Sequence, residues 1–125
     1  MNANMYNGMS LAYLGDAIYE VYIRKHALDS GLTKVNDLHN LVVQYTSSEA
    51  QMKAIHYLLD KEVLTSEEVL IYKRGRNSHV HSVRKNVDIK TYLDATGFEA
   101  VLGYLYLMGN IVRLEELISI VLDME

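Results

Sequence analysis

Apolar and polar residues alternate along most of the chain with the spacing of helices. Two strongly apolar segments of helical length stand out, residues 11–24 (LAYLGDAIYEVYIR) and residues 96–107 (TGFEAVLGYLYL). The stripe that helical spacing predicts for the core face of the first segment consists of Leu11, Leu14, Ile18, Val21 and Tyr22. The chain has no proline, no sustained strand-type alternation and no internal repeat, so an all-α fold is predicted.

The middle of the chain carries signals for two shorter helices. Asn36 or Asp37 is expected to cap a helix that ends near residue 45. Ser48 and Gln51 have the spacing of a capping box, which predicts a second helix over residues 48–59.

Two further helices are predicted beyond residue 60. Thr65 and Glu68 form another capping box, and Gly75 supplies a natural stop for the helix that they begin. Residues 112–124 have the pattern of a final amphipathic helix. Short polar links would connect these elements into a helical bundle.

Each of the two long apolar segments contains an acid, Asp16 in the first and Glu99 in the second. A buried carboxylate costs free energy unless a cation, a metal ion or hydrogen bonds compensate it. Gly15 and Gly103 lie beside these acids, and glycine inside a helix is best explained by close contact with another helix. We therefore predict that the two carboxylates meet and share a metal site.

An acid on an amphipathic helix can also be a boundary residue that pairs with a nearby base. Glu20 fits that interpretation because it lies four residues before Arg24, the favourable spacing for a helical ion pair. Glu20 is therefore left out of the predicted site.

The composition limits the class of protein. A chain of 125 residues with 50% hydrophobic content can bury one core, so residues 1–125 are expected to form one domain. The absence of cysteine excludes disulfides, thiolate chemistry and cysteine-ligated zinc. Neither a signal peptide nor a membrane-spanning segment is evident, so a cytoplasmic location is expected.

The net charge of −4 does not suggest a nucleic-acid binder, but the charges are unevenly distributed. Residues 69–87 contain no Asp or Glu. The bases in this stretch are Lys73, Arg74, Arg76, Arg84 and Lys85, accompanied by His79 and His81. Such a stretch is either a solvated loop or a docking site for phosphates, to which Asn77 could add a neutral donor.

At this point the motifs resemble those of a known family. The segment LAYLGDA, residues 11–17, resembles the signature of the ribonuclease III endonuclease domain, and FEAVLGYLYL, residues 98–107, resembles its second acidic helix. With NDLH at residues 36–39 and KRGRN at residues 73–77 between them, the order resembles Mini-ribonuclease III, a branch without a separate RNA-binding domain.

The resemblance implies an all-helical, homodimeric endoribonuclease that cleaves double-stranded RNA and leaves 5′-phosphate ends. It implies a role in maturing precursor large-subunit (23S) ribosomal RNA, where a ribosomal protein on the precursor could be a further partner. Asp16 and Glu99 would be the catalytic residues and the ligands of Mg²⁺, for which Mn²⁺ could substitute. The residues expected to bind RNA are Lys73, Arg74, Arg76, Asn77, Arg84 and Lys85.

The chain departs from the wider family at two positions. Ala12 and Thr96 stand where the larger ribonucleases III have a glutamate and an aspartate, which leaves the number of metal ions open. Two alternatives follow: a non-catalytic ribonuclease III-like scaffold that binds RNA, and a helical protein-interaction module whose acids form surface ion pairs.

Tyrosines surround the first helix on several sides. Tyr13, Tyr19 and Tyr22 cannot all face one core, which hints that a second surface is covered by a partner. A large core with tyrosines at its margin is the alternative. With the family resemblance, a twofold dimer is expected.

Overall fold

The computed structural model describes residues 2–78 and 88–124, and these residues form helices without any strand. The elements in order are η1 (Ala3–Met5), α1 (Gly8–Asp29), α2 (Val35–Thr46), α3 (Ser48–Asp60), α4 (Ser66–Arg76), α5 (Ile89–Leu107) and α6 (Ile111–Asp123). The predicted all-α class is confirmed. No helix in this part of the chain is both long enough and apolar enough to cross a membrane.

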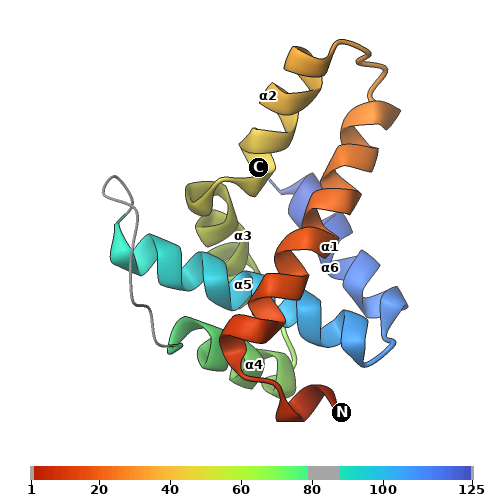
Figure 1. The fold of residues 1–125 in the computed structure, drawn as a ribbon. Helices are drawn as coiled ribbons and strands as arrows, with labels where there is room; N and C mark the ends of the chain where they lie inside the picture. The colour runs from red at the N-terminus through yellow and green to blue at the C-terminus, as the bar shows by residue number, and fades with distance from the viewer. Residues whose placement is uncertain (1, 79–87, 125) are drawn as a thin grey trace.

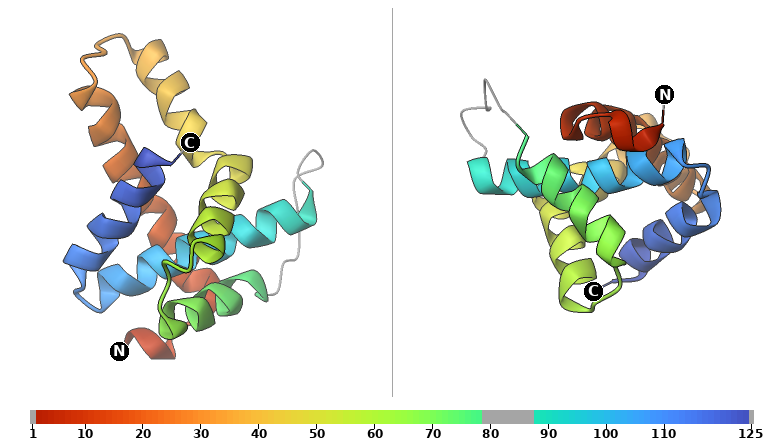
Figure 2. Two further views of the ribbon diagram at one scale, coloured as in Figure 1. Left: turned by 180° about the vertical axis from the view of Figure 1, so that it is seen from behind. Right: turned by 90° about the horizontal axis from the view of Figure 1, so that it is seen from below.

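Helix α5 runs through the middle of the molecule. Helices α1, α3, α4 and α6 all pack against it, as Figures 1 and 2 show from three sides. Every residue from 94 to 105 is buried except the half-buried Glu99. A helix that is apolar or small-sided all round is stable only when other helices surround it, which explains its central position.

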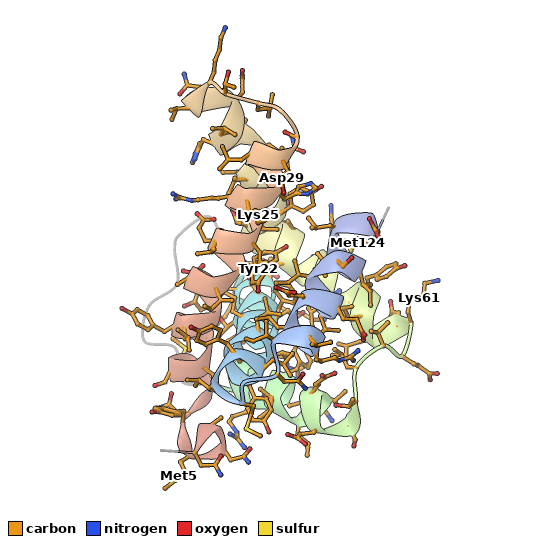
Figure 3. The ribbon with its side chains drawn as sticks, turned by 90° about the vertical axis from the view of Figure 1, so that its right-hand side faces the viewer. Met5, Tyr22, Lys25, Asp29, Lys61 and Met124 are labelled. Carbon is orange, nitrogen blue, oxygen red and sulfur yellow. The ribbon has the colours of Figure 1, made fainter. Side chains whose placement is uncertain are left out.

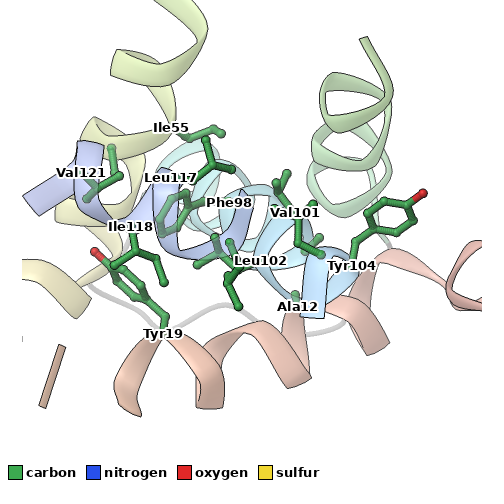
Figure 4. Packing of buried hydrophobic residues seen from close by; sticks show 14 of the residues in the cluster. Ala12, Tyr19, Ile55, Phe98, Val101, Leu102, Tyr104, Leu117, Ile118 and Val121 are labelled. Atoms are coloured by element: carbon green, nitrogen blue, oxygen red, sulfur yellow. The ribbon is translucent and has the colours of Figure 1, made fainter. Parts of the chain in front are cut away.

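The core fills the space between α5 and its neighbours (Figure 4). The Tyr19 ring of α1 meets the Phe98 ring of α5 edge to face, with 5.1 Å between their centroids. Helix α6 adds Leu114, Leu117, Ile118 and Val121. These side chains fix how α1 and α6 lie against the central helix.

The core stripe predicted for α1 was partly wrong. The residues of α1 that are buried are Gly8, Leu11, Ala12, Gly15, Tyr19, Ile23 and Ala27. Val21 is 64% exposed instead. Ala12 and Gly15 allow α1 to approach α5 closely, so the buried face includes small residues that a stripe of large apolar side chains overlooks.

The prediction from Gly15 and Gly103 is confirmed by the packing. A side-chain carbon on Gly15 would overlap the carbonyl oxygen of Glu99, and one on Gly103 would overlap the carbonyl oxygen of Leu11. The two helix backbones therefore touch where α1 crosses α5, and only glycine allows this approach.

Of the two ends predicted for α4, the structure confirms the first. The capping box of Thr65 and Glu68 is present at the start of α4. Gly75, predicted as a stop, lies within α4, where an added side-chain carbon would be 2.7 Å from Cβ of Ala100 and 2.9 Å from Cα of Gly97. The stop prediction was wrong because this glycine serves a helix contact, and α4 continues to Arg76.

The caps predicted for α2 and α3 were also wrong. Helix α2 begins at Val35 after Lys34, which makes no side-chain cap, so neither Asn36 nor Asp37 caps it. The cap of α3 is Ser47, whose side chain accepts a hydrogen bond from the Ala50 N–H. Gln51 is therefore free of the capping role and is 3% exposed.

Helices α1 and α2 fold back on each other and extend beyond the other helices (Figure 1). The predicted pair of Glu20 and Arg24 is present, at 3.3 Å. Tyr22, which Figure 3 labels on the same helix, donates a hydrogen bond of 2.8 Å to Glu115 of α6. This bond ties α1 to α6, while Tyr13, Val21 and Leu28 on another face of α1 stay exposed.

Candidate functional site

Asp16 and Glu99 line one surface pocket of about 310 Å³. Asp16 comes from α1 and Glu99 from the centre of α5, 83 positions apart in the sequence. The other lining residues are Thr46, Ser47, Ser48, Gln51, Tyr92, Ala95 and Thr96, from the junction of α2 with α3 and from the first half of α5. The structure therefore brings together the two acids that the sequence singled out.

The helix crossing explains why they meet. Gly15, which precedes Asp16, lies against the backbone carbonyl of Glu99. Because no side chain separates the two backbones there, the adjacent carboxylates emerge on the same side of the crossing. The position of the pair is thus set by rigid helices rather than by a loop, which favours a precise arrangement.

The two carboxyl groups interact directly. Burial, followed by the hydrogen bond to Asp16 and its negative charge, raises the pKa of Glu99 to about 9. Ionising both of two adjacent carboxyl groups costs free energy, because their negative charges repel each other. Glu99 therefore keeps a proton at neutral pH and donates it to Asp16. A divalent cation would replace that proton, because its charge stabilises both ionised groups.

Gln51 is a site residue that the sequence interpretation missed. Its amide Nε2 donates to the Thr46 carbonyl oxygen at 3.1 Å and to Glu99 Oε2 at 3.4 Å. A signal was available in the sequence, since Gln51 lies on the same face of α3 as the core residues Ala54, Ile55 and Leu58. A polar residue on a buried face needs polar partners, and here one of them is Glu99.

The polar side chains of the pocket fit a hard divalent cation. Two carboxylates and a carboxamide offer only oxygen ligands, the type that Mg²⁺ prefers, while waters and a phosphate can complete an octahedral shell. Within residues 2–78 and 88–124, no group of three or more His, Cys, Asp or Glu side chains could hold a metal ion. The pair of carboxylates is therefore a small ligand set.

The two positions that differ from the wider family have distinct surroundings. Thr96 lines the pocket, and its hydroxyl donates to the Tyr92 carbonyl oxygen at 2.9 Å. Ala12 is 5% exposed and belongs to the core cluster, as Figure 4 shows. Position 12 therefore contributes packing to the helix crossing and offers no ligand.

The predicted RNA-binding residues lie partly within the described structure. Lys73, Arg74, Arg76 and Asn77 are exposed at the end of α4, on the same side of the molecule as the start of α5 in Figures 1 and 2. Arg84 and Lys85, with His79 and His81, lie outside the described residues.

Arg74 also has a structural role that the sequence did not reveal. Its guanidinium donates to the carbonyl oxygens of Asn4 and Tyr6, at 3.3 and 3.4 Å. These bonds hold the N-terminal segment against α4. Arg74 therefore differs from Lys73 and Arg76, which make no such bond to that segment among the described residues.

Comparisons with known proteins give a consistent result. The model of the ribonuclease III domain family matches residues 9–110. The Mini-ribonuclease 3 of Streptococcus pneumoniae is 48% identical over 119 residues, which cover 95% of this chain and 93% of that protein. The Mini-ribonuclease 3 of Enterococcus faecalis is 50% identical over 113 residues, covering 90% and 86%.

A solved structure is similar over the same length. The X-ray crystal structure of a protein from Fusobacterium nucleatum superposes with a TM-score of 0.83 at 29% sequence identity. The match covers 95% of this chain and 93% of that one. The helical arrangement described above is therefore shared by an experimentally determined structure.

Proposed function

This chain belongs to the ribonuclease III family, and from this premise we propose that it is a magnesium-dependent endoribonuclease that matures precursor 23S ribosomal RNA by cleaving double-stranded segments. Family membership supports a nuclease that acts on double-stranded RNA. The observation that carries the proposed chemistry is the convergence of Asp16 and Glu99 in one pocket.

In this proposal Asp16 and Glu99 are the catalytic residues and the ligands of Mg²⁺. Bound there, Mg²⁺ would polarise the scissile phosphate and activate a water molecule, and Mn²⁺ could substitute for it. Glu99 must release its proton before it can bind the cation, since the ionised carboxylate is the ligand. Cleavage of the bond to the 3′ oxygen would leave 5′-phosphate ends.

The start of α3 would assist these carboxylates. Ser47 and Ser48 line the pocket at the N-terminus of this 13-residue helix, where unpaired backbone N–H groups and the helix dipole favour an anion. A backbone phosphate of the RNA carries the complementary charge. We propose that this helix end orients the substrate against the carboxylates.

The basic end of α4 would bind the duplex backbone. Lys73, Arg76 and Asn77 are exposed and follow one another within a single turn. Contacts to phosphates and 2′-hydroxyls suit double-stranded RNA, whose shallow minor groove presents both. Arg84 and Lys85 are proposed to extend this RNA contact. We also propose that residues 1–125 form a single catalytic domain.

Two active sites are needed to cut both strands, so we propose a homodimer, with a ribosomal protein on the precursor as a further partner. The exposed face of α1 supports the dimer, since Tyr13, Val21 and Leu28 are 85%, 64% and 60% exposed. Leu28 also lines a groove between α1 and α2, to which α2 contributes Val35 and Val43. Apolar surface of this kind is typical of an interface between protein chains.

The proposed function is tested by incubating the purified protein with a precursor ribosomal RNA stem and Mg²⁺ and then mapping the ends of the products. We expect paired cuts with 5′-phosphate ends, and no cuts when EDTA removes the metal. Binding of the stem without any cleavage would instead support the non-catalytic scaffold, which Ala12 and Thr96 suggest as the second candidate.

A further inference from the structure

We propose that Gln51 is a third protein ligand of the metal site, with its carboxamide oxygen Oε1 facing the ion while its amide N–H group positions Glu99. The inference rests on the proposed function, because it assigns a role within the same pocket. Neither the family motifs in this sequence nor the pair of acids includes this residue.

The hydrogen bonds of Gln51 fix which way its amide points. Nε2 lies against the Thr46 carbonyl oxygen and Glu99 Oε2, and both of these atoms are acceptors when Glu99 is ionised. Turning the amide over would place Oε1 against the same two oxygens and would lose both hydrogen bonds. The carbonyl oxygen of the amide is therefore directed away from Thr46 and from the bound oxygen of Glu99.

That carbonyl oxygen has no hydrogen-bond partner among the described residues, although the side chain is 97% buried. An unpaired buried acceptor destabilises the folded protein, so such an atom calls for a ligand or a water. Two other buried side-chain atoms lack a partner in this part of the chain, Tyr19 Oη and Glu20 Oε2. Of the three residues, Gln51 alone lines the pocket of the two carboxylates.

The position of Gln51 also suits a fixed ligand. It lies in the first turn of α3, and its bond to Thr46 joins it to the last residue of α2. A side chain that hydrogen bonds already hold in place loses little conformational freedom when it binds an ion. Gln51 is therefore held beside Glu99, with a carbonyl oxygen that no protein donor in the described residues occupies.

A neutral oxygen has a specific advantage in this pocket. The Asp16 and Glu99 carboxyl groups line it together, and two negative charges side by side repel each other. A third carboxylate would add to that repulsion before metal binds, whereas a carboxamide adds a hard oxygen ligand without a charge. Gln51 thus compensates in part for the acids that positions 12 and 96 lack.

The test is a titration of the full chain with Mn²⁺, followed by water-proton relaxation and calorimetry, with and without an uncleavable RNA duplex. We expect Gln51→Leu to weaken Mn²⁺ binding by at least tenfold, because it removes both the oxygen and the support for Glu99. Gln51→Glu should bind Mn²⁺ more tightly than the wild type, since the charge that it adds beside the ion outweighs the amide donor that it removes from Glu99. Gln44→Leu, in an exposed glutamine of α2 outside this pocket, should leave the affinity unchanged.

The outcomes separate the two proposals. If the wild-type chain neither binds Mn²⁺ nor cleaves RNA, the proposed function fails. If the wild type does both while Gln51→Leu keeps wild-type affinity, only the role of Gln51 is overturned. Should Gln51→Leu fail to fold by circular dichroism, Gln51→Glu decides: tighter Mn²⁺ binding supports the inference, and equal or weaker binding overturns it.

Discussion

The backbone carbonyl of Glu99 lies so close to Gly15 that no side-chain carbon fits between them. This contact places Asp16, the next residue along α1, beside the Glu99 carboxylate, so a packing feature and the candidate chemistry depend on the same residue. We therefore expect Gly15→Ala to affect both. Backbone displacement at such a contact should lower the free energy of unfolding by about 3 kcal/mol.

A matched glycine variant separates the effect on stability from the effect on metal binding. Gly8→Ala adds the same methyl group where the start of α1 meets the carbonyl oxygen of Arg74 in α4, a contact that includes no residue of the carboxylate pocket. Urea unfolding should show both variants to be destabilised, whereas the Mn²⁺ affinity of the folded protein should fall only for Gly15→Ala. Equal affinities in the two variants would contradict the link between the glycine and the pair of acids.

These glycines also show how far sequence reasoning reaches. Gly15 and Gly103 could be interpreted because each lies beside an acid in a long apolar helix, and the capping box at Thr65 is a local signal. Gly75 was misinterpreted because a glycine near a helix end has the same local pattern whether it stops the helix or packs against a neighbour. Only the tertiary contact with α5 distinguishes the two.

The same reason explains why the site was incompletely predicted. Gln51 fits a capping box when only its spacing from Ser48 is considered, yet the helix begins after Ser47 and the side chain turns inward. With Ser47 as the cap, Gln51 is the fourth residue of the helix rather than the third, and it shares the buried face with Ala54, Ile55 and Leu58. The acids were found because their local setting is unusual, whereas the glutamine depends on its neighbours in space.

Neutral replacements of the two carboxylates should separate cleavage from RNA binding. We expect Asp16→Asn or Glu99→Gln to reduce the rate of cleavage by at least about 100-fold, since each removes a ligand charge that stabilises the transition state. Filter binding should show unchanged RNA affinity. Asp60→Asn, at the exposed end of α3, provides the control and should cleave normally. Unchanged cleavage in Asp16→Asn would show that Asp16 is not catalytic.

The raised pKa of Glu99 predicts how stability depends on pH without metal. Because its pKa is about 9 in the folded state against a usual value of 4.5, the folded state binds more protons than the unfolded state between these values. Stability contributed by this group is therefore lost as the pH rises from about 4.5 through about 9. We expect the free energy of unfolding in EDTA to fall by on the order of 2 kcal/mol between pH 6 and pH 9.

Two comparisons check the origin of this pH dependence. Glu99→Gln cannot titrate, so its unfolding free energy should change less over the same range. Mn²⁺ affinity in the wild type should rise with pH, since the metal must displace the proton from Glu99. A pH-independent affinity between pH 6 and pH 9 would show that Glu99 is already ionised or is not a ligand.

Alanine substitutions of the three basic residues at the end of α4 should have different effects on RNA binding and on stability. Lys73→Ala and Arg76→Ala are expected to weaken RNA binding and to reduce the slope of its salt dependence by about one unit for each phosphate that is no longer neutralised. Arg74→Ala should also lower the melting temperature, because it releases the carbonyls of Asn4 and Tyr6. Lys61→Ala, at an exposed lysine labelled in Figure 3, should leave the RNA affinity unchanged.

A single charged substitution on the exposed face of α1 tests the proposed dimer. Val21 is 64% exposed there, beside Tyr13 and Leu28, and burying a charge in an apolar interface costs more than association can recover. We expect the wild type to sediment as a dimer at micromolar concentration and Val21→Asp to sediment as a monomer with slower cleavage. Val112→Asp changes a valine of α6 that is 80% exposed outside this face, so it should remain dimeric. A monomeric wild type, or a dimer that survives Val21→Asp, would place the interface elsewhere or remove it.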